Sequence, residues 1–204
     1  MHISEGILSA PVLMAGAGLT AAGVAISLKR MKNKDIPRIA IIAAGLFVAT
    51  LIHIPLGPTS VHLLLNGIAG ILLAWHVFPA FLVVLLLQAI LFQFGGITVL
   101  GVNTLILALP AIISYYLFKV MADNISYQSY RFKLAGFGCS TLAVLLTSIL
   151  AALVLMFTEQ AFLQVARLII LAHLPLSILE GIIGVFCLVF IKKIKPEILT
   201  GDVL

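Results

Sequence analysis

The stretch of sequence that decides the fold covers residues 55–93 and reads PLGPTSVHLLLNGIAGILLAWHVFPAFLVVLLLQAILFQ. It contains no Asp, Glu, Lys or Arg, and its apolar part divides into two segments, residues 61–75 and 77–93. A helix that crosses a bilayer needs about 20 apolar residues. This stretch therefore predicts two helical segments that lie in a membrane.

The rest of the chain has the same character. Of its 204 residues 63% are hydrophobic and 9% are charged, whereas soluble domains are about 25% charged. The mean hydropathy is +1.27. Further apolar segments occupy residues 7–28, 39–56, 97–118, 134–157 and 165–191. We therefore predict an all-α, polytopic membrane protein with seven transmembrane helices, forming one transmembrane domain over residues 1–204 in a lipid bilayer.

The basic residues predict the orientation, because Lys and Arg concentrate on the cytoplasmic side of membrane proteins. With seven spans, eleven of the twelve fall on one side and only Arg167 on the other: Lys29, Arg30, Lys32, Lys34, Arg38, Lys119, Arg131, Lys133, Lys192, Lys193 and Lys195. The N-terminus is then outside and the C-terminus cytoplasmic, in the cell inner (cytoplasmic) membrane. Topology thus explains the net charge of +5, and we predict no nucleic-acid partner.

The first apolar segment does not read as a cleavable signal peptide. Glu5 stands where a signal peptide has a basic region, and the apolar run that follows is too long. We therefore expect Met1 to remain the N-terminal residue of the mature protein.

The segment at residues 55–60, PLGPTS, cannot be regular helix because it contains two prolines and a glycine. The segment that follows, residues 61–75, would span about 22 Å as a helix, against a hydrocarbon core of about 30 Å. Its start should therefore lie inside the membrane. Irregular backbone at that depth is tolerated beside protein or a water-filled cavity, and in transporters it often builds the binding site.

Met1 and His2 carry the most specific chemistry. The α-amine, the deprotonated amide of His2 and its imidazole Nδ1 can close two adjacent chelate rings around one metal ion. Nitrogen-rich tetragonal sites suit Ni(II) and Cu(II), and imidazole also suits cobalt and zinc. The alternative is that His2 is an ordinary exposed terminal residue.

Further polar residues fall at the predicted outer half of the spans, where they could surround a cavity. His62 is a candidate fourth ligand, with a helix-capping or interfacial role as the alternative, and His53 is expected to stabilise the loop. Candidates for an outer shell around the metal are His53, Asn66, Gln88, Asn103 and His173. His173 and Glu180 share one face of the last helix, where an intramembrane hydrogen bond is favoured over a charge relay. His76 falls on the inner side.

Motifs that are missing narrow the function. The sequence has no GxxxxGK[ST] loop, so we predict that the chain binds no ATP itself. HExxH and GxSxG are also missing, which disfavours a membrane protease or esterase. A membrane-embedded metalloenzyme using His53, His62 and His173 remains an alternative, although Glu180 is expected to lie too deep to serve these histidines as a base. An autonomous permease or channel is disfavoured because no polar path leads to the inner face.

Several motifs together resemble the substrate-binding components of energy-coupling-factor cobalt and nickel transporters, the CbiM/NikM family. The start of the chain, MHISEG, is similar to the family's MHIxEG. The other matching stretches are GPTSVH at 57–62, QAILF at 88–92 with Gly95 and Gly96, GVN at 101–103, AHL at 172–174 and Glu180 with Gly181. They extend over nearly the whole chain. His53 is not shared by all members, and its role stays open.

This resemblance implies a non-enzymatic seven-helix membrane subunit that captures Co2+ or Ni2+ as its transported substrate. It implies that the metal is held by the Met1 amine, the His2 amide and imidazole, and His62. It implies as partners a transmembrane coupling (T) protein, cytoplasmic ATPase subunits and a small accessory membrane subunit. The GPTSVHLLLNG form of the loop is more similar to the cobalt branch, which supports cobalamin synthesis, and nickel is the alternative.

Overall fold

The computed structural model describes residues 3–56, 59–122 and 125–199. Within them the chain is helical apart from one hairpin. The helices are α1 (Ala10–Arg30), α2 (Ile36–Ala49), α3 (Asn66–Leu73), α4 (Val77–Phe92), α5 (Leu100–Ala122), α6 (Tyr130–Thr158) and α7 (Leu163–Ile194). The hairpin consists of β1 (His53–Leu56) and β2 (Thr59–His62).

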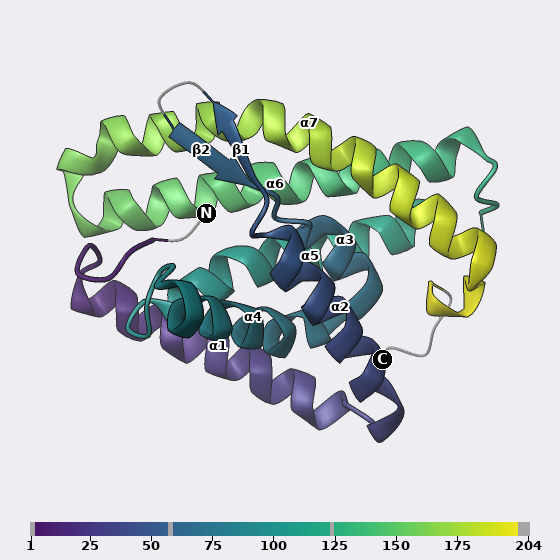
Figure 1. The fold of residues 1–204 in the computed structure, drawn as a ribbon, viewed down its shortest axis with the longest axis horizontal. Coiled ribbons are helices and arrows are strands. Elements are labelled where there is room, and N and C mark those ends of the chain that lie inside the picture. Colours follow the sequence, from purple (N-terminus) through teal and green to yellow (C-terminus); the bar gives the residue numbers. More distant parts are fainter. Residues whose placement is uncertain (1–2, 57–58, 123–124, 200–204) are drawn as a thin grey trace.

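The long helices run roughly along one common direction (Figure 1). α6 and α7 lie side by side along one edge, α5 and the short α3 occupy the centre, and α1 and α4 lie along the opposite edge. α2 packs against α4. The first described residues lie at one end of this bundle, and the last described residues lie at the other (Figure 1). The N-terminal and C-terminal segments are therefore separated by the length of the helices.

Five stretches of the described residues are long and apolar enough to cross a membrane. They are α1, the stretch Asn66–Phe92 that joins α3 to α4, α5, α6 and α7. The protein is therefore an all-helical membrane protein in class, as the sequence predicts. Each of the seven expected segments overlaps one α-helix. The expected spans at residues 39–56 and 61–75 are wrong in their extent, because α2 has 14 residues and α3 has eight.

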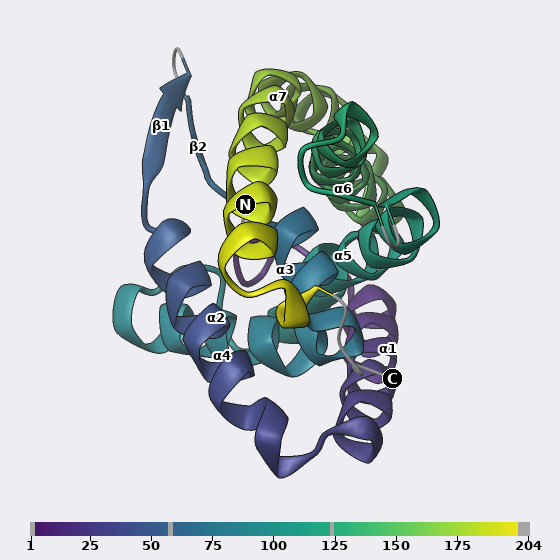
Figure 2. The same cartoon turned by 90° about the vertical axis from the view of Figure 1, so that its right-hand side faces the viewer.

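The hairpin replaces the end of one expected span and the start of the next. β1 and β2 pair antiparallel, with His53 opposite His62 and Leu56 opposite Thr59, while residues 57 and 58 lie outside the described part. The sequence correctly excludes a helix here but predicts irregular backbone where paired strands are found. Strand pairing gives partners to backbone groups of residues 53–56 and 59–62, which are not in a helix. Figure 2 shows the hairpin extending from the body of the molecule beside α7.

α3 is a short buried helix bounded by two breaks in the backbone. Leu65 before it and Ala74 after it have positive φ angles of 49° and 48°, a conformation that ends regular helix. Every residue of α3 is buried. Its first residue, Asn66, donates through Nδ2 to the Thr147 hydroxyl at 2.7 Å and to the Leu107 carbonyl at 3.3 Å, which ties the start of α3 to α5 and α6.

A glycine in α3 sets how closely this helix approaches α5, and substitution there should destabilise the fold. A methyl group at Gly70 would overlap the Ala111 carbonyl, whereas one at Gly138 would meet no atom within 4 Å. We expect Gly70→Ala to lower the stability of the protein by about 1–3 kcal/mol through overpacking. Thermal unfolding in detergent measures this effect. Gly138→Ala is the matched control and should be neutral or slightly stabilising; equal midpoints for the two variants would contradict the close packing.

Candidate metal-capture site

The segment that precedes α1 is folded into the bundle rather than extended away from it. Ile3 and Leu8 are 6% and 8% exposed. They belong to an apolar cluster that includes Val99, Ile106 and Leu155, with Ile169 of α7 packed against it. Met1 and His2, where the sequence predicts the chelate, lie outside the described residues. The first described residue thus lies among α5, α6 and α7.

Asn103 holds Ile3 through a reciprocal pair of hydrogen bonds. The Ile3 amide donates to Asn103 Oδ1 at 3.1 Å, and Asn103 Nδ2 donates to the Ile3 carbonyl at 3.0 Å. Both residues are buried. The sequence predicted Asn103 near the metal, and the structure places it against the residue that follows His2, where it fixes the backbone.

Glu5 forms a second attachment between the N-terminal segment and the turn before α5. Its carboxylate accepts from the Thr98 amide at 2.9 Å and from the Thr98 hydroxyl at 3.2 Å. Gly96, at φ +142°, leaves the space that the Glu5 side chain fills. The hydrogen bonds from the Thr98 amide and hydroxyl stabilise the Glu5 carboxylate and lower its pKa. The contact therefore persists as the pH falls below the usual pKa of a glutamate, and it is lost only when the pH passes below the lowered pKa. The sequence analysis used Glu5 in a motif and missed this role.

His62 ends β2 and is buried. Its Nδ1 lies 3.0 Å from the Leu63 carbonyl. Because a carbonyl only accepts, Nδ1 is the protonated nitrogen and Nε2 carries the lone pair. Metal-binding histidines commonly have this arrangement, in which the other ring nitrogen donates to a backbone carbonyl. His53 is the strand partner of His62, while its side chain lies outside the described part.

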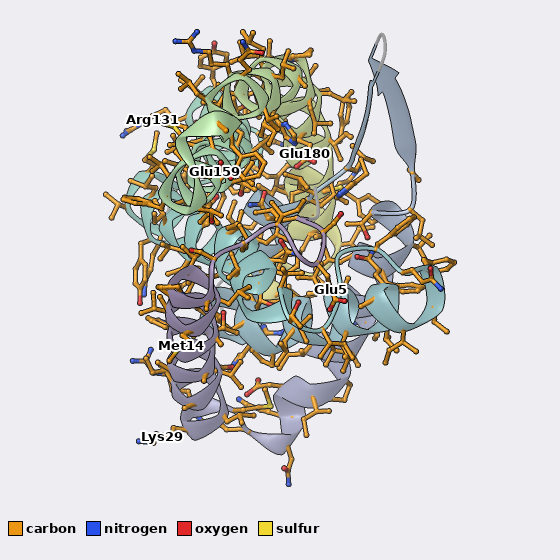
Figure 3. The ribbon with its side chains drawn as sticks, turned by 90° about the vertical axis from the view of Figure 1, so that its left-hand side faces the viewer. Glu5, Met14, Lys29, Arg131, Glu159 and Glu180 are labelled. Atoms are coloured by element: carbon orange, nitrogen blue, oxygen red, sulfur yellow. The ribbon has the colours of Figure 1, made fainter. Side chains whose placement is uncertain are left out.

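Glu180 holds the three residues that connect His62 to α3. It is 1% exposed on α7, and its carboxylate accepts from the Leu64 amide and, at 2.9 Å, from the Leu65 amide. Figure 3 shows Glu180 inside the bundle, while Lys29 and Arg131 lie at its periphery. An intramembrane hydrogen bond was expected for Glu180, but its partner is this backbone segment. The carboxylate therefore lies closer to His62 than the sequence suggested.

His173 is a second buried histidine; it lies on α7, whereas His62 lies at the end of β2. It is 4% exposed on α7, and its Nδ1 lies 2.7 Å from the Ile169 carbonyl. The strand that ends at His62, β2, packs against α7, which carries His173. Among the described residues, no three His, Cys, Asp or Glu side chains are grouped so that they could hold a metal ion. The two imidazoles alone do not make up such a group.

The other predicted polar residues have mainly structural partners. Gln88 donates to the Thr50 hydroxyl at the end of α2, and Asn66 ties α3 to α5 and α6. His76 Nδ1 lies 2.9 Å from the Ser27 hydroxyl near the C-terminal end of α1, at the other end of α1 from the N-terminal segment. The structure thus brings together Ile3 with Asn103 and His62 with His173, and separates His76 from them.

The long apolar helices, with a folded-in N-terminal segment beside α5 and two buried imidazoles on β2 and α7, define a polytopic membrane protein with polar groups inside its helical bundle. The chain belongs to the CbiM family, because the family model described as "Cobalt uptake substrate-specific transmembrane region" matches residues 2–198.

Individual relatives support this assignment. A putative metal transport protein of Haemophilus influenzae is 44% identical over 98% of this chain and 97% of its own. The cobalt transport protein CbiM of Clostridium tetani is 31% identical over 98% and 89%. A solved structure described as a transition metal transporter is 25% identical, with a TM-score of 0.74 over 98% of this chain and 96% of that one.

One relative connects the family to nickel and to further subunits. The fused nickel transport protein NikMN of Rhodobacter capsulatus is 36% identical over 53% of this chain and 33% of its own length. The relatives are thus named as transport proteins, which favours transport over the metalloenzyme alternative. The chain is a multi-pass membrane protein of the cobalt and nickel transport type.

The Asn103 attachment leads to a test that needs no metal. In Asn103→Leu the Ile3 amide and carbonyl lose their buried partners, each worth about 1 kcal/mol. We expect the N-terminal segment to open at least about tenfold more often. Hydrogen–deuterium exchange of a peptide covering residues 3–8 measures this opening.

Thr104→Val is the matched control, because the Thr104 hydroxyl donates to the Leu100 carbonyl within α5 at 2.8 Å. It should leave the exchange of that peptide unchanged. Equal exchange in the two variants would show that Asn103 does not hold the N-terminus.

Proposed function

We propose that this chain is the substrate-capturing subunit of an ATP-driven energy-coupling-factor importer, and that it takes up a divalent cobalt or nickel ion from outside the cell. The observation that carries the proposal is the reciprocal pair of hydrogen bonds between Ile3 and Asn103. A protein that uses its own N-terminus as a ligand has to hold that terminus at a fixed place, because preorganisation reduces the entropy lost on binding. The family assignment supports the same function.

The proposed ligands are the Met1 amine, the His2 amide nitrogen, the His2 imidazole and Nε2 of His62. The bond from His62 Nδ1 to the Leu63 carbonyl supports this choice, because it leaves the lone pair on Nε2. The position of Ile3 also supports it, because the apolar cluster around Ile3 includes Ile169, whose carbonyl lies against His173. Asn103 and His173 then surround the ligands, whereas Asn66 and Gln88 support them through the helices.

We propose that the seven helices lie within the membrane, with the N-terminus outside and the C-terminus in the cytoplasm, in the inner membrane of the cell. The distribution of charge in the fold supports this orientation. Lys29 and Arg30 lie in the last turn of α1, Lys119 in the last turn of α5, and Lys192 and Lys193 in the last turn of α7. The metal would thus approach from the end that carries Ile3.

Energy for transport is proposed to come from partners: a transmembrane coupling protein, cytoplasmic ATPases and a small accessory membrane subunit. The missing phosphate-binding loop supports this division, and so does the fused form of the NikMN relative. Cobalt for cobalamin synthesis is the proposed cargo, supported by the description of the family and by the CbiM relative. Nickel is the alternative, supported by the NikMN relative.

An N-terminal extension tests the terminal chelate. Adding Gly-Ser before Met1 turns its α-amine into an amide and leaves every side chain in place. We expect affinity for Ni2+ and Co2+ to fall at least about 100-fold, or roughly 2.8 kcal/mol, as measured by equilibrium dialysis of the purified chain. The same two residues added after Leu204 are the matched control and should change nothing. Native affinity in the extended variant would exclude the amine as a ligand.

Paired histidine substitutions test His62. His62→Gln should weaken Ni2+ and Co2+ binding at least about tenfold, because an amide is a poorer ligand for these ions than imidazole. His76→Gln removes another buried imidazole, bonded to Ser27, and should leave affinity unchanged. Thermal unfolding of both variants in detergent checks that each is folded. Equal affinities would remove His62 from the site.

A further inference from the structure

We propose that the imidazoles of His62 and His173 form a second, inner position for a divalent metal ion, which accepts Co2+ or Ni2+ as the ion leaves the terminal chelate. This inference deepens the proposed function and rests on it. It adds a ligand, His173, and a step between capture at the N-terminus and release toward the cytoplasm.

The first observation is the state of the His173 ring. Its Nδ1 lies 2.7 Å from the Ile169 carbonyl, which can only accept, so Nδ1 carries the proton and Nε2 the lone pair. Nε2 is buried and has no hydrogen-bond partner among the described residues. Leaving a buried polar atom without a partner costs about 1–3 kcal/mol. A lone pair fixed in this way in a membrane interior suits a metal ion.

The second observation is that His62 presents the same chemistry nearby. Its Nδ1 is bonded to the Leu63 carbonyl, so its lone pair also lies on Nε2. The two rings come from different elements, β2 and α7, which pack against each other, and Glu180 of α7 bonds the backbone two residues after His62. A backbone carbonyl on the far nitrogen orients an imidazole and increases its basicity toward a metal. Two such imidazoles are ligands that suit cobalt and nickel.

The third observation concerns charge. A divalent ion inside a membrane needs a countercharge nearby. Glu180 is the one Asp or Glu within the helices α1–α7 of the described residues. It lies seven residues, about two turns, beyond His173 on α7, and it holds the backbone directly after His62. One carboxylate thus lies near both imidazoles. Along α7 it lies on the C-terminal side of His173.

The test separates the inner position from the terminal chelate by working in the chain extended with Gly-Ser before Met1. Co2+ is titrated into the detergent-purified protein, and its visible d–d absorption reports the bound ion. We expect the extended chain to keep one weak Co2+ equivalent. Adding His173→Leu should abolish this equivalent, whereas adding His76→Leu, the matched control, should keep it.

In the extended chain, two results would overturn the proposal: no bound Co2+, or equal Co2+ binding with and without His173→Leu. If the leucine variant is not monodisperse, His173→Gln replaces it with the same expected loss. In the chain without the extension, His173→Leu should keep the tight site within about threefold, or roughly 0.7 kcal/mol. Loss of tight binding there would place His173 in the terminal chelate and would also reject an inner position.

The same data distinguish this inference from the proposed function. If the extension leaves tight binding intact, the terminal chelate is wrong. The inner position is then judged by stoichiometry, because His173→Leu should lower the number of bound Co2+ ions by one and His76→Leu should not.

Discussion

The arrangement of the site depends on one interaction, the bond between the Glu180 carboxylate and the amides of Leu64 and Leu65. The hairpin ends at His62 and α3 begins at Asn66, so the link between them belongs to neither element. Lipid offers such amides no partner, and each one left unsatisfied in a membrane costs several kcal/mol. A single buried carboxylate removes that cost twice. The same carboxylate also fixes the backbone between His62 and the first residue of α3.

Two further attachments hold the N-terminal segment, one to α5 and one to the turn before α5. Asn103 fixes the backbone of Ile3, and Glu5 fixes the turn before α5. Glu180 and Asn103 are both buried polar residues whose hydrogen-bond partners are backbone groups. These bonds offset the cost of burying each side chain, and they fix the position of the backbone segment that makes them. Of the four ligands proposed for the metal, three come from Met1 and His2, directly before Ile3, and one comes from His62, directly before the segment that Glu180 holds.

Sequence alone predicts the membrane class and the general place of the helices, because apolar length and helix breakers are local properties. It does not predict that residues 53–56 and 59–62 form paired strands. It also does not predict that α3 starts at Asn66, because the residue before it is held by Glu180, 115 residues after Leu65. The partners of Asn103 and Glu5 cannot be predicted from the sequence for the same reason, since Ile3 and Thr98 are remote from them in the chain. His62 and His173 are identifiable as polar residues in apolar surroundings, whereas their proximity is a property of the fold.

Close packing between α1 and α5 fixes the position of the N-terminal segment. The buried residues of α1 are Gly16, Thr20, Gly23 and Ser27, about one per turn, and such small residues let helix backbones approach closely. A methyl group at Gly16 would overlap Val102, and one at Gly101 would overlap Ala17. The Thr20 hydroxyl also donates to the Gly101 carbonyl at 2.6 Å. These contacts lie within two residues of Asn103, so the helix that follows the N-terminal segment and the residue that holds Ile3 share one closely packed joint. The terminal ligands that we propose would follow directly from this joint, which is fixed by close backbone packing, and such packing allows fewer alternative arrangements than packing between long side chains.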